Sequence, residues 1–176
     1  MELYEAMKAR HSVRAYLDKP VEEAALMRIL EAGRSAPSWC NRQCWRIVVV
    51  RDASVREMLG EVLNNPTKDC YVNAPCTLVV CADPSDSGIM GGKEYYMADC
   101  AIAMEHMVLA AMAEGLSTCW VGAFQEYPVR NVLHLPKEIK VVGITPLGYA
   151  AEEPEAAPRK PIDEIVYYDG WLKSKQ

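Results

Sequence analysis

The sequence predicts an α+β fold in which helices flank a central β-sheet. Short, nearly continuous apolar runs at 45–50 and 76–82 are bounded by polar or turn residues, as is typical of buried strands. The segment 21–33 instead spaces its apolar residues three and four positions apart, which indicates an amphipathic helix. A chain of 176 residues suits one domain, because at this size folding removes roughly 70% of the unfolded chain's surface from water.

The predicted elements follow one another without an internal repeat. Helices are expected at residues 2–9, 21–33, 54–63, 95–114 and 128–133, and strands at residues 45–50, 76–82, 117–122 and 140–148. Pro37 and the run Asn64-Asn65-Pro66 follow two of these helices and end them, since the residue before a proline avoids the helical region. The strand at 45–50 is expected to be central, because both of its faces are apolar. Residues 83–92 are expected to form a polar loop.

The longest helix and the chain end suggest a partner subunit. Residues 95–114 are apolar nearly all round, which predicts burial on most sides, within the fold or between subunits. Charged residues such as Asp99 and Glu105 argue against a membrane span, so no membrane partner is expected. Residues 1–150 are expected to form the core, and residues 151–176 an extended tail. Its β-rich segment 162–168 is expected to pair with the sheet of a second copy.

Composition excludes several classes of protein. The formal net charge is −5 and the isoelectric point is about 5.3, whereas binding to nucleic acid or an anionic membrane needs a clustered basic surface. The N-terminus lacks the features of a signal peptide. The seven cysteines contain no Cys-x-x-Cys pair, which fits a reducing cytoplasm and predicts no metal site. Three of them lie in apolar surroundings and are expected to be small core residues: Cys81, Cys100 and Cys119.

Two polar segments have the chemistry of a ligand site. In an extended conformation Arg10, Ser12 and Arg14 share one face, which matches a phosphate and an electron-rich ring edge. The alternative is an ordinary helix end with surface arginines. The segment Pro37–Gln43 offers amides that both donate and accept, as a flavin pyrimidine requires. Its alternative is a loop whose Ser and Asn bond their own backbone.

The strand end after Val121 is a third candidate. Gly122 and Ala123 could bring backbone N–H groups close to a ligand, or could simply satisfy a strand end that needs small residues. Glu105 and His106 lie in the middle of the long helix. We expect them to make interhelical hydrogen bonds rather than to act as catalysts.

The ordered set of motifs resembles the FMN-dependent nitroreductase family over nearly the whole chain. The motifs are RHSVR, APSWCNRQCWRIVVV, YYMADCAIAMEHMVLAAMAEGLSTCWVGAF, PLGY and PRKPIDEIV. The resemblance implies a three-layer sandwich whose central sheet is mixed or antiparallel, and a homodimer with two FMN sites at its interface, each built from both subunits. Trp39 stands where that family more often has a small residue, and Cys44 replaces its usual proline.

The resemblance also implies residue roles. Arg10, Ser12 and Arg159 would hold the FMN phosphate, with His11 in the same segment, and Arg14 would lie near N1 and O2 of the ring. The backbone of Gly122 and Ala123 would face N5 and O4. Lys68 is a candidate for a residue of the loop 63–75 that contacts the flavin edge. The second subunit would contribute Pro37, Ser38, Trp39 and Asn41.

The activity implied is reduction of nitroaromatics, quinones or similar electron-poor acceptors with NAD(P)H. The hydride would pass through flavin N5 in a ping-pong sequence, with no catalytic side chain of the protein itself. A non-catalytic protein that stores FMN or senses redox state through its cysteines is the alternative. A third possibility is an enzyme that acts on the flavin itself or on a halogenated or thiolated aromatic.

Overall fold

The core of the protein is a four-stranded antiparallel sheet in the order β1-β2-β6-β5. The strands are β1 (Trp45–Val50), β2 (Cys76–Ala82), β6 (Lys140–Gly148) and β5 (Ser117–Thr118). The computed structural model describes residues 1–63, 68–152, 154–155 and 157–171. The predicted α+β class and the expected buried strand at 76–82 are both confirmed, since β2 is buried along its whole length.

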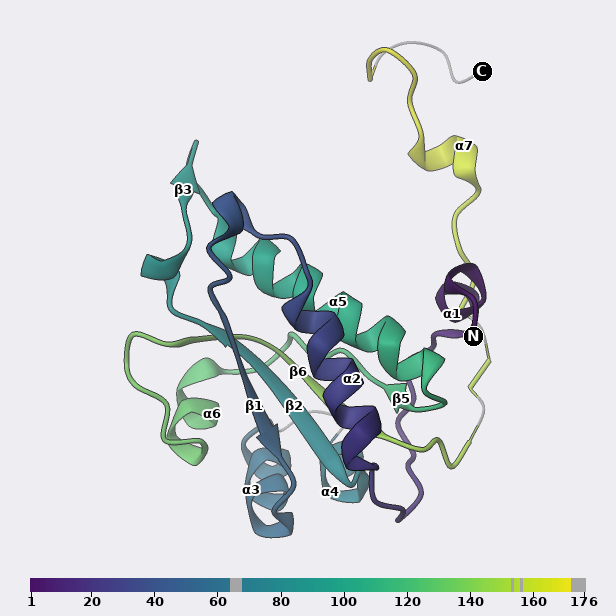
Figure 1. Cartoon of the computed structure of the whole chain (residues 1–176), viewed down its shortest axis with the longest axis vertical. Coiled ribbons are helices and arrows are strands. Elements are labelled where there is room, and N and C mark those ends of the chain that lie inside the picture. The colour runs from purple at the N-terminus through teal and green to yellow at the C-terminus, as the bar shows by residue number, and fades with distance from the viewer. Residues whose placement is uncertain (64–67, 153, 156, 172–176) are drawn as a thin grey trace.

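Helices cover both faces of the sheet, which gives three layers (Figure 1). Alternate β2 residues Leu78 and Val80 face one apolar cluster, and Val79 and Cys81 face the other, as the two-residue period of a strand requires. The first cluster lies under α2 (Glu23–Arg34) and α5 (Tyr95–Ala113). The second lies under α3 (Ala53–Leu63), α4 (Lys68–Asn73) and α6 (Glu126–Val132).

The expectation that residues 45–50 form a central strand is wrong. In the described part of the chain, β1 pairs with β2 alone and is an edge strand. Its continuous apolar run has another cause. Ile47 packs against the cluster under α2 and α5, while Val48 packs against the cluster under α3 and α6. Both faces therefore need apolar side chains, although one edge of the strand is open.

The α2 and α5 helices approach closely because Gly33 has no side chain. A Cβ atom at Gly33 would lie 2.7 Å from Met107 Cγ, closer than real contacts allow. Near the same contact the His106 imidazole lies 3.3 Å from the Ala32 carbonyl oxygen, so its predicted interhelical hydrogen bond is confirmed. Glu105 is exposed and makes no such bond within the described residues.

The α5 helix has the length and apolar composition of a membrane span. Seven of its residues are nevertheless buried in the protein, Asp99 and Met104 among them. The expectation of a helix buried on most sides holds for the face toward α2 and the sheet. Met97 and Ile102 point outward and are exposed.

Other elements differ from the predictions. The expected loop 83–92 contains η2 (Pro84–Asp86) and β3 (Ile89–Met90). The β3 strand forms a hairpin with β4 (Lys93–Glu94), and the turn between them places Gly91 and Gly92 at positive φ. Beyond β5, the expected strand 117–122 continues only as a single bridge between Val121 and Ile144. Helix α4 was not predicted at all.

The prediction of a β-rich segment at 162–168 is wrong for the single chain. Residues Ile162–Ile165 form the short helix α7, which follows Pro161 and carries Asp163 and Glu164 in its first turn, both favourable at a helix start. Among the residues that the structure describes, no strand pairs with this segment. Figure 1 shows the tail passing α1 (Leu3–Ala9) and leaving the body of the protein.

Candidate functional site

The segment Arg10–Arg14 is extended and lies along the outer edge of the sheet. Ser12 forms a parallel bridge with Thr118 of β5, and the Val13 N–H donates to the Thr118 carbonyl at 3.0 Å. Val13 is buried, so its two neighbours, Ser12 and Arg14, point away from the core. The structure therefore produces the alternation that the sequence predicts.

These residues line a pocket of about 290 Å³ together with the start of the tail. Among the described residues its lining consists of Arg10, His11, Ser12, Arg14, Pro154, Glu155, Ala157 and Arg159. Three arginines and a serine therefore line one space, with Glu155 as the acidic residue among these described neighbours. This donor set suits a phosphate, because guanidinium groups form paired, charge-assisted hydrogen bonds with its oxygens. The side chains that line the pocket therefore fit the phosphate of a cofactor such as FMN.

A second, more apolar cavity lies beside the arginine pocket. This cavity of about 500 Å³ shares His11 and Pro154 with the arginine pocket. It is also lined by Leu17, Met112 and Tyr149.

The positive charge of Arg14 acts on Cys119, which directly follows β5 at the edge of the sheet. Burial raises the pKa of the Cys119 thiol, and the Arg14 guanidinium and the Ser12 hydroxyl oppose that rise. The Arg14 side chain also donates to the Ser12 carbonyl at 3.3 Å. An anionic ring edge placed here would meet the positive charge of Arg14.

The loop Pro37–Gln43 is held in an unusual backbone conformation. Cys40, Asn41 and Gln43 have φ values of 47°, 55° and 51°, in the left-handed region that residues other than glycine adopt rarely. The Ser38 hydroxyl accepts from the Gln43 N–H at 2.9 Å and closes the loop. Gln43 Nε2 donates to the Asn41 carbonyl oxygen at 3.2 Å. The self-bonding alternative for this loop is therefore realised in part, while Asn41 remains exposed.

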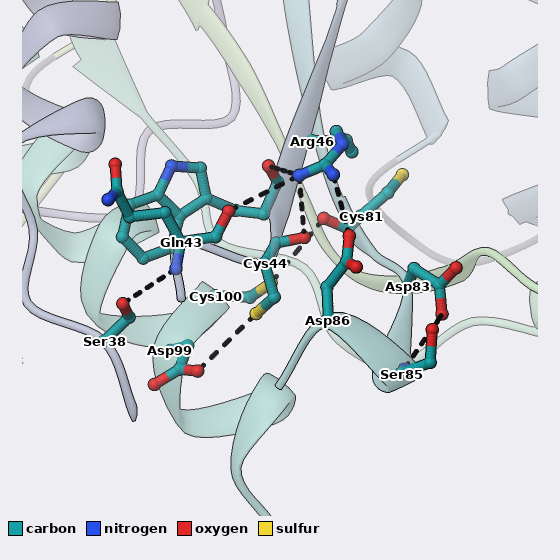
Figure 2. A network of polar contacts seen from close by, with 11 residues as sticks. Ser38, Gln43, Cys44, Arg46, Cys81, Asp83, Ser85, Asp86, Asp99 and Cys100 are labelled. Atoms are coloured by element: carbon teal, nitrogen blue, oxygen red, sulfur yellow. Dashed lines mark hydrogen bonds and ion pairs between the residues drawn. The ribbon is translucent and has the colours of Figure 1, made fainter. Parts of the chain in front are cut away.

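A buried carboxylate anchors this loop to α5. Asp99 is 3% exposed and accepts from the Trp39 backbone N–H at 2.8 Å, the Ser87 hydroxyl at 2.8 Å and the Cys44 thiol at 3.5 Å. Figure 2 shows the Asp99 carboxylate turned toward Cys44 and the Ser38–Gln43 contact closing the neighbouring loop. Burial, and then the Asp99 charge, raise the pKa of the Cys44 thiol, which keeps it a neutral donor.

This role of Asp99 was not predicted from the sequence. A signal was available, because an acidic residue within a helix that is apolar on all sides must find hydrogen-bond donors if it is buried. The identity of those donors depends on loops distant in sequence.

The two predicted halves of the site lie at opposite ends of α5. Trp39 contacts Tyr95 and Asp99 near the start of that helix, whereas a groove joins α1 to Leu109 and Ala113 near its end. No residue of Pro37–Gln43 lines the arginine pocket within the described chain. One chain by itself therefore does not bring the two halves together.

The remaining candidates fall at the periphery. Gly122 and Ala123 are exposed and follow the Val121–Ile144 bridge, on the stretch of chain that continues from Thr118. Lys68 begins α4 and is exposed, and its side chain lies near the Gly60 position of α3 rather than in the arginine pocket. Residues 64–67 of the loop 63–75 lie outside the described residues.

Comparisons with known proteins agree on one family. The sequence model described as "Nitroreductase family" matches residues 7–70 and 64–149. A solved nitroreductase family protein from Clostridium novyi NT is 37% identical, with a TM-score of 0.82 and coverage of 99% of this chain and 97% of that chain. An FMN-dependent nitroreductase from Clostridium difficile R20291 is 26% identical, with a TM-score of 0.84 and coverage of 94% and 98%. A Bacillus subtilis (strain 168) relative named FMN reductase [NAD(P)H] is 27% identical and covers 99% of this chain and 76% of the relative.

Proposed function

The chain belongs to the nitroreductase family, and from that premise we propose that it is an FMN-dependent oxidoreductase that uses NAD(P)H to reduce nitroaromatics, quinones or similar electron-poor acceptors. The observation that carries the proposal is the pocket in which Arg10, Ser12 and Arg14 meet Arg159 of the tail. Three arginines that line one pocket concentrate positive charge there, which favours binding of an anion. A phosphate bound there would be neutralised by these groups.

In this proposal Arg10, Ser12 and Arg159 hold the FMN phosphate, with His11 beside them, and Arg14 faces the N1 and O2 edge of the ring. When bound, FMN would supply the site with a group that accepts a hydride at N5 from NAD(P)H and passes it to the acceptor. The role of Arg14 is electrostatic, because its positive charge stabilises negative charge at that edge. The backbone of Gly122 and Ala123 would face N5 and O4.

We further propose that the working enzyme is a homodimer. Pro37, Ser38, Trp39 and Asn41 stand far along α5 from the arginine pocket of their own chain, so a second copy is needed for both halves to meet. Near α1, a groove of about 570 Å³ lined by residues such as Met7, Leu109 and Ala113 supports an apolar contact between subunits.

The proposed cofactor and activity can be tested directly on the purified protein. We expect a yellow protein whose flavin is released on denaturation and identified as FMN, and which oxidises NADH or NADPH in the presence of menadione or nitrofurazone. A yellow protein that binds FMN tightly but does not oxidise either nicotinamide would favour the storage alternative. A colourless protein that fails to take up added FMN would refute the proposal.

A further inference from the structure

Trp39 is held in one orientation by contacts on three sides. Its backbone N–H donates to Asp99 Oδ1 at 2.8 Å, and its ring meets the Tyr95 ring with centroids 4.2 Å apart at 38°. The third contact is with the backbone of Gly88, where a Cβ atom would lie only 2.3 Å from Trp39 Nε1. The indole therefore lies directly on a glycine that has to lack a side chain.

Asp99 joins the parts that surround the indole. Its second oxygen, Oδ2, accepts from the Ser87 hydroxyl at 2.8 Å, and Ser87 precedes Gly88. On the other side of Gly88, the Tyr95 N–H donates to the Gly88 carbonyl at 2.9 Å. One carboxylate thus fixes the loop that carries Trp39 and the segment against which the indole packs. Within the described residues no Lys or Arg forms a salt bridge with Asp99, so its role depends on these neutral donors.

The loop beyond Trp39 would not hold its shape without such anchors. Non-glycine residues in the left-handed region cost about 1–2 kcal/mol each, and Cys40, Asn41 and Gln43 all lie there. Trp39 is half-buried, so part of the residue is accessible to a molecule that binds beside the loop. A large, fixed aromatic ring at this place would limit the size of such a planar molecule.

We propose that Asp99 is the positioning residue that fixes the Trp39 indole as a rigid wall of the acceptor-binding space, so that the enzyme favours single-ring over fused-ring acceptors. This inference rests on the proposed function, since it takes the loop Pro37–Gln43 to face the bound flavin. It adds a selectivity determinant to that loop, because Asp99 and Gly88, which are not among the proposed cofactor contacts, set the position of Trp39. Asp99 touches neither substrate nor cofactor in this proposal.

The experiment compares kcat/KM for 1,4-benzoquinone and for the fused-ring acceptor menadione in FMN-loaded variants. Asp99→Ala removes the anchor and should shift the ratio of the two values toward menadione about tenfold, at the low end of what a methylene-sized change in an apolar pocket gives. Asp99→Asn keeps an oxygen for the Trp39 N–H and should stay within about twofold of the wild-type ratio. Asp52→Ala is the matched control, because Asp52 also accepts from a serine hydroxyl and backbone N–H groups but caps the distant α3.

Gly88→Ala displaces the indole from the opposite side while leaving Asp99 intact, and should shift the ratio in the same direction. It also keeps the proposal testable if Asp99→Ala does not fold. In a Trp39→Ala background neither change should move the ratio by more than about twofold, because the wall is already absent.

An unchanged ratio in Gly88→Ala and in any folded Asp99→Ala protein, or equal shifts with and without Trp39, would overturn the inference. If the wild-type protein itself neither bound FMN nor reduced either quinone, the proposed function would be overturned instead.

Discussion

Arg10 and Arg159 line the same pocket although they come from opposite ends of the chain. Arg10 follows α1 directly, as its C-cap residue, and Arg159 lies in the extended tail before α7. The tail therefore helps to form the arginine pocket of the core, besides any contact that it makes with a second copy.

The arginine pocket predicts a specific loss of phosphate recognition. Arg10→Ala and Arg159→Ala should each weaken FMN binding by about 1.5–3 kcal/mol, because each removes a charge-assisted hydrogen bond. Binding of riboflavin, which has no phosphate, should change little. Titration of the flavin-free protein, followed by flavin fluorescence, measures both constants. Arg34→Ala is the matched control, since Arg34 pairs with Glu31 on the exposed side of α2. Equal losses for FMN and riboflavin would contradict the phosphate assignment.

We expect dimer assembly and FMN binding to require residues 152–171 of the tail. A chain that ends after Ala151 should aggregate or behave as a flavin-free monomer, because it lacks Arg159 and the segment expected to contact a partner. A chain that ends after Trp171 keeps both and should remain a yellow dimer. Sedimentation velocity with absorbance at the flavin band measures mass and colour together. A yellow, monomeric protein from the shorter chain would show that the tail is dispensable.

The kinetics should be ping-pong, because the nicotinamide and the acceptor take turns at one face of the cofactor. Double-reciprocal plots of rate against NAD(P)H at several menadione concentrations should give parallel lines. Glu105→Gln should keep most of the activity, since Glu105 is exposed on α5 and no protein acid is required. Intersecting lines would mean that both substrates bind at once and would reopen the search for a second binding site.

The buried thiols predict a loss of stability at alkaline pH. Burial raises the pKa of Cys70 and Cys76 to about 11 and that of Cys81 to about 12. In the unfolded chain these thiols ionise near pH 8.5. The folded state therefore keeps its full stability below that value and loses it as the pH rises toward 11–12. At pH 10.5 we expect each thiol to lower the free energy of unfolding by about 1–3 kcal/mol relative to pH 7.5.

Urea unfolding under reducing conditions at the two pH values measures this loss. Cys81→Ala should show a smaller difference between pH 7.5 and pH 10.5 than the wild-type protein, although its stability at pH 7.5 is itself lower. Identical differences in the two proteins would assign the alkaline transition to other groups.

Cys40 is exposed while the remaining cysteines are buried. If the protein stored FMN and sensed redox state through its cysteines, the first thiol to react would therefore be Cys40.

Sequence patterns predicted elements best where local rules and packing agree. The strand Cys76–Ala82 and the helix from Tyr95 were predicted almost to the residue, because their apolar patterns match the layers that cover them. The pattern at Trp45–Val50 was read correctly as a strand but misplaced at the centre of the sheet. Apolar residues on both faces of a strand indicate that helices cover it above and below. They do not indicate whether the strand has a hydrogen-bonded neighbour on each side.

The sequence by itself determined the α+β class, the alternation that turns Arg10, Ser12 and Arg14 to one side, and the polar character of Pro37–Gln43. These depend on residues that are close neighbours in the chain. Only the tertiary structure decided that Arg159 joins Arg10, that Pro37–Gln43 lies at the other end of α5, and that Asp99 anchors Trp39. Each of these relationships joins segments that are distant in sequence. Their positions depend on how the helices pack on the sheet, and no local sequence pattern encodes that packing.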